Sequence, residues 1–415
     1  MYELLKGRLM VVRLVLLAAT LALVAIGIAA IYSIGNPAQA SPVSQAGKWS
    51  ILWKKQLIFA IIGLAGFIAV NLVNYRRFGV VSFWIYSFVL MLLGLLLVSR
   101  FIVELPFVPE INGTHRWIKF KIAGRDLPAI QPSEICKIAY ILALAWYLRY
   151  RSNYRNFKAL IGPFVLTLLP MVLILLEPDL GTVLLMMPIF FAVLFVAGAK
   201  VKHLLVIVLL AVIVSPLFWH KMEPYQRTRI SSVLLQNNWI RQKAECHPTV
   251  GKILVGRKFS AKQWENDWGY HLTRSKFAVA SGGTGGYGFR LGPFIKYDFL
   301  THRHNDFIFA VIAHQWGFFG SLVLLGLYAL IISCGLEIAV HNTDPFGRLL
   351  AAGVVAMFTV EVLINVSMTV GLMPITGLTL PLVSYGGSSL LVSMASVGLL
   401  NNVGRRWPFS VARKT

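Results

Sequence analysis

Long apolar runs, separated by short polar segments, dominate the hydropathy pattern of this chain. About ten of these runs are long enough to cross the roughly 30 Å hydrocarbon core of a membrane as helices. Their approximate limits are 10–32, 56–73, 78–99, 132–149, 159–177, 181–199, 203–220, 307–335, 347–370 and 382–403. The first run exceeds the apolar region of a usual signal peptide, which favours a retained span.

The pattern predicts an all-α polytopic membrane protein with about ten transmembrane helices. Residues 1–415 form a single integral-membrane domain in this prediction, and residues 221–306 form a large extracytoplasmic loop between helices 7 and 8. Composition agrees, because 57% of the residues are hydrophobic and only 13% are charged, whereas soluble proteins are typically about 25% charged.

Lysine and arginine gather in one set of short loops. They precede the first run, follow the last one, and recur at 74–77, 149–158 and 200–202. The positive-inside rule makes these loops and both termini cytoplasmic. The loop 221–306 then faces outward, and its many basic residues do not break the rule because long loops cross regardless of charge.

The net charge of +23 raises the question of an anionic partner. Nucleic acid is not expected, because the basic residues flank membrane segments instead of forming a stripe with interleaved aromatic residues. In the outer loop, fourteen Lys or Arg face six Asp or Glu between Lys221 and Asp306. That excess favours a polyanionic ligand at the outer surface, such as a lipid-linked pyrophosphate.

A few acidic residues lie in or beside the apolar runs, where charge is costly and suggests function or a buried pair. They are Glu134, Glu177, Asp179 and Glu361, with Asp306 at an outer boundary. Glu134 stands three residues before Lys137, a spacing that fits a structural ion pair as well as a binding site. Asp179 is placed either to cap the next helix or to face substrate. Its neighbour Glu177 implies a cation nearby or a raised pKa.

Two glycine-rich stretches indicate unusual backbone. "SGGTGGYGFRLG" (281–292) lacks the ending of a phosphate-binding loop, and we expect a tight outer loop close to substrate or to helix ends. "PITGLTLPLVSYGGSSLL" (374–391) has the prolines and glycines of a re-entrant segment. Such backbone persists at membrane depth only where protein or a wet cavity covers its polar groups, so it predicts a cavity on the outer side.

Seven strings of the chain, in this order, resemble those of the SEDS family of shape, elongation, division and sporulation proteins. They are "INGTHRWI", "IQPSEICKIA", "LLEPDLGT", "YQRTRI", "SKFAVASGGTGGYGFRLG", "HNDFIFAVIA" and "GLMPITGLTLPLVSYGGSSLL". The resemblance runs over nearly the whole chain. It implies a ten-helix peptidoglycan glycosyltransferase that polymerises lipid II, an undecaprenyl-pyrophosphate substrate, outside the bacterial cytoplasmic membrane during elongation or division. It also implies a class B penicillin-binding protein as partner.

The resemblance places the family's catalytic aspartate on Asp306, whose carboxylate would accept the proton of the attacking sugar hydroxyl. The candidate substrate-binding residues are Arg116, Lys119, Glu134, Lys137, Asp179, Arg290, Ser384 and Ser388. Arg116 and Lys119 would hold pyrophosphate or remain solvated, whereas the two serines would shape the cavity. No organic cofactor is expected. A divalent cation, Mg²⁺ or Mn²⁺, is chemically compatible, although no ligand cluster demands it.

The chain departs from the family near Asp306. Three acids of the common pattern are replaced by His302, His314 and Gln315. These histidines either pack and hydrogen-bond in the cavity or tune Asp306. The stretch 234–268 is also longer than expected, so the sequence alone is compatible with altered activity.

Two other functions remain open at this stage. A lipid II flippase would use similar broken helices and charges, but would need polar groups along the whole path. The unusual residues gather on the outer side instead, which favours the transferase. A noncatalytic scaffold for a class B penicillin-binding protein would tolerate the loss of Asp306, and the presence of that residue argues against it.

Overall fold

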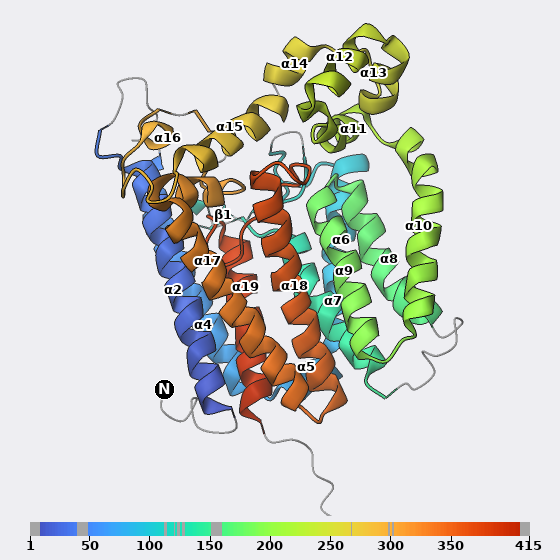
Figure 1. The fold of residues 1–415 in the computed structure, drawn as a ribbon. Helices are drawn as coiled ribbons and strands as arrows, with labels where there is room; N and C mark the ends of the chain where they lie inside the picture. Colours follow the sequence, from blue (N-terminus) through green and yellow to red (C-terminus); the bar gives the residue numbers. More distant parts are fainter. Residues whose placement is uncertain are drawn as a thin grey trace, which may run out of the picture.

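The structure is a computed structural model that describes residues 9–39, 49–111, 114–119, 121–122, 125–126, 129–150, 160–266, 268–297, 299–300 and 303–406. Long helices stand side by side in a bundle, and shorter helices lie across one end of it (Figure 1). The β-structure of the described residues is a two-residue antiparallel ladder, β1 (Lys121–Ile122) with β2 (Arg125–Asp126), and two isolated β-bridges.

A helix lies over each of the predicted apolar segments. They are α2 (Met10–Gly35), α4 (Leu52–Leu72), α6 (Ser82–Phe101), α7 (Pro132–Leu148), α8 (Ile161–Leu176), α9 (Leu180–Val196), α10 (Val201–Lys221), α17 (Ile308–His341), α18 (Pro345–Thr369) and α19 (Gly387–Arg405). Within the described residues, α2, α4, α6, α17 and α18 are long and apolar enough to cross a membrane by length and composition. The prediction of a helical, multi-pass membrane protein is therefore confirmed at this level.

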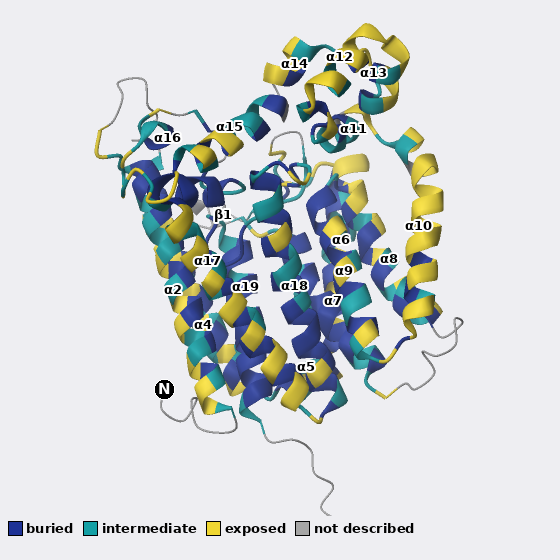
Figure 2. Cartoon of the chain, viewed as in Figure 1, coloured by how far each residue is buried: buried dark blue, intermediate teal, exposed yellow. Residues whose placement is uncertain are grey.

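Burial follows the position of each helix in the bundle. Large apolar side chains face outward on the peripheral helices, among them Ile61, Met91 and Val212. Exposed positions alternate with buried ones along α4 and α6, whereas α10 is exposed over most of its length (Figure 2). An apolar outer surface of this extent suits lipid contact. Helix α18 is central, since 72% of its most apolar 18-residue stretch is buried.

The segment between α10 and α17 forms a layer of short helices over one end of the bundle, which we call the short-helix layer (Figure 1). It contains α11 (Pro224–Ser231), η3 (Leu234–Gln236), α12 (Asn238–Cys246), α13 (Pro248–Val255), α14 (Ala261–Asn266), α15 (Trp268–Ser281) and α16 (Pro293–Lys296). A small core of its own, with Leu235, Val255 and Trp264, holds the longer-than-expected stretch together.

The two described ends of the chain meet at the opposite end of the bundle. Leu9, which precedes α2, and Arg406, which follows α19, border the same small pocket together with Asn342. Both described ends therefore lie away from the short-helix layer (Figure 1).

The glycine-rich stretch 281–292 forms backbone hydrogen bonds to α17 where that helix is interrupted. That helix is interrupted at Gly317, whose φ and ψ are 61° and −155°. The stretch supplies the missing partners: Phe318 N donates to Gly283 O at 2.9 Å, and Gly288 N donates to Gln315 O at 2.9 Å. A Cβ on Gly286 would lie 2.2 Å from Gln315 O, so the close approach requires glycine. The backbone of this stretch therefore packs directly against α17 and provides hydrogen-bond partners at the interruption.

Candidate functional site

A cavity of about 880 Å³ lies between the bundle and the short-helix layer. Its lining residues come from the first two turns of α4, the first turns of α7, α9 and α19, the short-helix layer and the residues just before α17. Ile111 and the segments 114–119, 375–379 and 385–386 also contribute to the lining. Six of the residues singled out from the sequence line it together: Arg116, Lys119, Glu134, Asp179, Asp306 and Ser388.

The segment 371–386 between α18 and α19 is not helical and forms one wall of this cavity. Buried side chains hold its backbone: Tyr328 Oη donates to Pro381 O, and Gln56 Nε2 donates to Ser384 O at 3.0 Å. Protein side chains thus bind carbonyl groups of this broken segment, and the segment borders a cavity, as its prolines and glycines predicted.

Asp306 faces this wall together with an arginine of the short-helix layer. A Cβ placed on Gly377 would lie 3.8 Å from Asp306 Oδ2 and 3.3 Å from Nη2 of Arg229. The carboxylate and the guanidinium therefore approach the same glycine from the start of α17 and from α11. Sequence reasoning assigned no role to Arg229, although the string "YQRTRI" that contains it belongs to the resemblance.

The cavity lining is rich in cations. Lys55, Arg116, Lys119 and Arg229 line it, against the carboxylates of Glu134, Asp179 and Asp306. Asp179 and Glu134 are among the carboxylates that have partners in the protein. Such a lining suits a ligand with an anionic group and a polar body.

Asp179 is one of the partnered carboxylates, and it is both a helix cap and a wall of the cavity. Its Oδ1 accepts from Thr182 N at 3.3 Å, and its Oδ2 accepts from Thr182 Oγ1 at 2.9 Å and from Ser133 Oγ at 3.0 Å. These bonds satisfy the first turn of α9 and join it to α7.

Glu134 belongs to a buried cluster of ion pairs. Lys137 Nζ lies 2.8 Å from Glu134 Oε2 and 2.6 Å from Glu361 Oε1, and all three side chains are buried. Lys137 does not line the cavity. The structural ion pair that the i, i+3 spacing suggested is thus present, and a third member from α18 completes it.

Arg116 joins the cavity wall to the connection between α8 and α9. Its Nε donates to Glu177 O at 2.6 Å and its Nη2 donates to Pro178 O. Glu177 lies beyond the last residue of α8, and burial, reinforced by the charge of Asp179, raises the pKa of its carboxyl to about 9. A protonated Glu177 at neutral pH removes the repulsion that the sequence implied between these two acids.

The remaining predicted side chains lie in different places. Ser388 Oγ accepts from Gln131 N at 3.1 Å in the cavity wall, whereas Ser384 is buried behind that wall. Arg290 is outside the lining residues. Its Nε donates to Asn36 O, which ties the glycine-rich stretch to the end of α2.

The residues that depart from the family pattern hold the same stretch in place. His314 Nδ1 lies 2.8 Å from Ser281 Oγ, and Gln315 Oε1 accepts from Arg290 N at 2.9 Å, while Gln315 Nε2 donates to Ser33 Oγ of α2 at 2.7 Å. Neither lines the cavity. His302 lies outside the described residues. The packing and hydrogen-bonding role predicted for these positions fits the observed contacts of His314.

A divalent cation would have few protein ligands here. No three His, Cys, Asp or Glu side chains gather as a metal site in the part of the chain that the structure describes. Asn305 lines the cavity beside Asp306, and its Oδ1 is buried without a hydrogen-bond partner. Magnesium is commonly held by one or two carboxylates plus substrate phosphates, so these two residues fit a cation that the substrate would complete.

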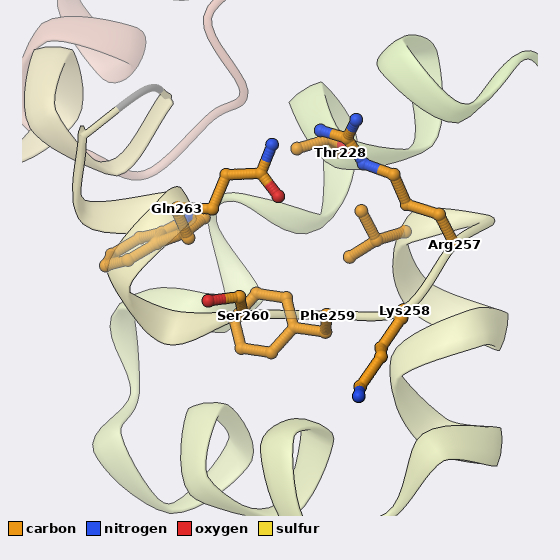
Figure 3. A pocket seen from close by; sticks show the side chains of 8 residues that line it. Thr228, Arg257, Lys258, Phe259, Ser260 and Gln263 are labelled. Carbon is orange, nitrogen blue, oxygen red and sulfur yellow. The ribbon is translucent and has the colours of Figure 1, made fainter.

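Another pocket lies inside the short-helix layer, lined by Thr228, Arg257, Lys258, Phe259, Ser260 and Gln263 among others (Figure 3). Its volume is about 10 Å³. A space of that size holds at most about one water molecule, which leaves the large cavity as the site for a ligand.

Comparisons with known proteins agree with this geometry. The family profile of the cell cycle proteins FtsW, RodA and SpoVE matches residues 13–407. The chain is 33% identical to peptidoglycan glycosyltransferase RodA of Treponema pallidum, over 94% of this chain and 97% of that protein. It is 36% identical to peptidoglycan glycosyltransferase MrdB of Escherichia coli K12, over 70% of this chain and 71% of that one.

Solved structures extend the likeness to the fold. A chain from a study of how a peptidoglycan synthase complex coordinates polymerization and crosslinking superposes with a TM-score of 0.70, at 31% identity, covering 94% of this chain and 96% of that one. Rod shape determining protein RodA of Thermus thermophilus gives a TM-score of 0.62 at 28% identity, over 94% and 95% of the two chains. Because one profile spans almost every residue and full-length relatives share both sequence and fold, the chain belongs to the family of FtsW, RodA and SpoVE cell cycle proteins.

Proposed function

We propose that this chain is a peptidoglycan glycosyltransferase that polymerises lipid II into glycan strands at the outer face of the bacterial cytoplasmic membrane. The relatives from Treponema pallidum and Escherichia coli carry that enzyme name. The observation that carries the proposal is the cavity, which brings Asp306 together with Lys55, Arg116, Lys119 and Arg229.

The chemistry divides between these two kinds of group. A hydroxyl of one sugar attacks the anomeric carbon of another, a new carbon–oxygen bond forms, and the bond to the polyprenyl pyrophosphate breaks. Asp306 accepts the proton of the attacking hydroxyl as a general base. The hydroxyl thereby becomes a better nucleophile at the moment of attack.

The cations of the lining act on the leaving group. The pyrophosphate is anionic both before and while its bond to the sugar breaks, so preplaced positive groups bind it in the ground state and the transition state alike. Arg116 is rigidly placed because its guanidinium already binds two carbonyl groups. A divalent cation beside Asp306 and Asn305 would add charge neutralisation of the same kind.

The proposed topology has ten membrane-crossing helices, with the short-helix layer outside and both termini in the cytoplasm. The distribution of lysine and arginine among the short loops supports this orientation. Both described chain ends lie at the end of the bundle away from the short-helix layer, which agrees with it. The proposed partner is a class B penicillin-binding protein, since the related chain comes from work on coordinated polymerization and crosslinking.

A flippase or a scaffold fits the cavity less well. A flippase needs polar groups along a path through the whole bundle, whereas the helical lining residues come from the first two turns of α4, the first turns of α7, α9 and α19, and the short-helix layer. A scaffold needs no cationic cavity around a carboxylate. The glycosyltransferase accounts for both features.

Polymerisation of lipid II by the purified chain, with its class B partner, tests the proposal. Asp306→Asn keeps the size of the side chain but cannot accept the proton, so we expect the rate to fall by about 10²-fold or more. Asp344→Asn is the matched control, because Asp344 also stands before a helix, α18, at the end of the bundle away from the cavity. Near-normal polymerisation by Asp306→Asn would remove the catalytic assignment.

A further inference from the structure

The backbone around Asp306 is not held by the helix that follows it. Helix α17 begins at Ile308, and its first amides, those of Ala310 and Val311, both donate to Phe307 O. The carbonyl groups of residues 304–306 therefore lie before the hydrogen-bonded part of the helix and need other donors.

Three donors from the C-terminal part of the chain bind these three consecutive carbonyls. Tyr385 N donates to His304 O at 2.9 Å, and Ser384 Oγ donates to Asn305 O at 2.7 Å. Asn365 Nδ2 donates to Asp306 O at 3.0 Å. The position of the Asp306 main chain is thus set by α18 and by the broken segment after it.

Asn365 also forms a second hydrogen bond, to the wall of the cavity. The same Nδ2 donates to Leu378 O at 2.7 Å, so the two amide hydrogens bridge Asp306 and the wall of the cavity. Leu378 follows Gly377, the residue that the Asp306 carboxylate faces. Asn365 is fully buried in α18. It therefore fixes the distance between the carboxylate and the opposite wall without touching the cavity itself.

We infer that Asn365, assisted by Ser384, is a positioning residue of the glycosyltransferase. The inference rests on the proposed function, in which Asp306 is the general base. A base works only if it is held within about 0.5 Å of the productive geometry, and a misplacement of about 1 Å costs on the order of 10²-fold in rate. Ser384, expected from the sequence to help bind substrate, acts from behind the wall because its hydroxyl is used by Asn305 O and by Leu380 N.

The chain offers a matched control in Asn402. This asparagine is also fully buried, and its Nδ2 also bridges two carbonyl groups, Val70 O at 2.6 Å and Val73 O. It lies near the end of α19, beside the described ends of the chain and away from the cavity. Asn365→Ala and Asn402→Ala therefore remove the same bonds at opposite ends of the bundle.

Steady-state polymerisation of lipid II by the full chain with its class B partner, together with thermal unfolding, tests the inference. Both alanine variants should lose similar stability. Asn365→Ala should lower kcat by about 10- to 100-fold with KM nearly unchanged, since a misplaced base affects the transition state and not ground-state binding. Asn402→Ala should keep kcat per folded molecule.

A second pair of variants guards against misfolding of Asn365→Ala. Ser384→Ala removes the donor to Asn305 O and should lower kcat, whereas Ser384→Thr keeps a hydroxyl and should restore it. Equal kcat values for Asn365→Ala and Asn402→Ala, or a rise in KM at unchanged kcat, overturn the inference. If Asp306→Asn is inactive while Asn365→Ala is normal, the inference fails alone; if Asp306→Asn is active, the assignment of the base fails with it.

Discussion

Gly377→Ala is the sharpest local perturbation of the cavity. Gly377 has a φ of +78°, in the left-handed region, and its missing side chain faces Asp306 and Arg229. An alanine in this conformation costs about 1–2 kcal/mol. If the broken segment moves to relieve that strain, the ratio of molecules with the native wall to molecules with a displaced wall falls by about 5- to 30-fold.

Steric crowding adds less to the cost of Gly377→Ala than the backbone conformation does. The new methyl group would lie 3.8 Å from Asp306 Oδ2, an ordinary contact, and 3.3 Å from Arg229 Nη2, which a flexible guanidinium relieves by a small shift. We therefore expect turnover of lipid II to fall by up to about 30-fold, following the fraction of molecules that keep the native wall.

Gly198→Ala is the control for this experiment. Gly198 has a φ of +93° in the connection between α9 and α10, and a Cβ at this residue would have no atom within 4 Å. The two variants thus carry similar backbone strain, but only one borders the cavity. Turnover per folded molecule, measured with purified proteins, should fall in Gly377→Ala and persist in Gly198→Ala. Equal turnover in both variants would refute the reasoning.

Two further predictions concern orientation and substrate binding. A membrane-impermeant maleimide should label the exposed Cys246 of the short-helix layer in intact cells. The second variant carries Thr343→Cys, in the connection between α17 and α18, together with Cys246→Ser. Its new cysteine should react only after the cells are permeabilised. The reverse pattern would invert the topology. Arg116→Gln should raise KM for lipid II more than it lowers kcat, because a group that holds pyrophosphate binds ground and transition states alike. Arg290→Gln should leave KM unchanged, since that side chain lies outside the cavity lining. An equal rise in KM in Arg116→Gln and Arg290→Gln would show that Arg290 also binds substrate.

Local patterns in the sequence determined the helical layout. A run long enough to cross a membrane is a property of consecutive residues, so helices were found over every predicted segment, with ends displaced by a few residues. The broken segment before α19 was equally visible, because proline and glycine act on their own backbone. The motif that contains Asp306 was found in the same way, as a short string.

Contacts between distant residues required the tertiary structure. Lys137 and Glu361 are separated by 224 positions, and nothing in the spacing of either indicates the other. Arg229 joins the site because the short-helix layer folds back over the bundle. The sequence left open whether His314 tunes Asp306 or packs in the protein. In the structure His314 bonds to Ser281 of the glycine-rich stretch, beside the break in α17 at Gly317.

Asp306 illustrates the difference between what local sequence determines and what the tertiary structure determines. Its identity and its position at a helix start are local facts, and the sequence was sufficient for both. Its orientation depends on Asn365, 59 residues away, and on a wall formed after α18. Hydrophobic periodicity specifies which faces are buried, whereas the pairing of buried polar groups depends on which helices meet, and only the packed bundle decides that.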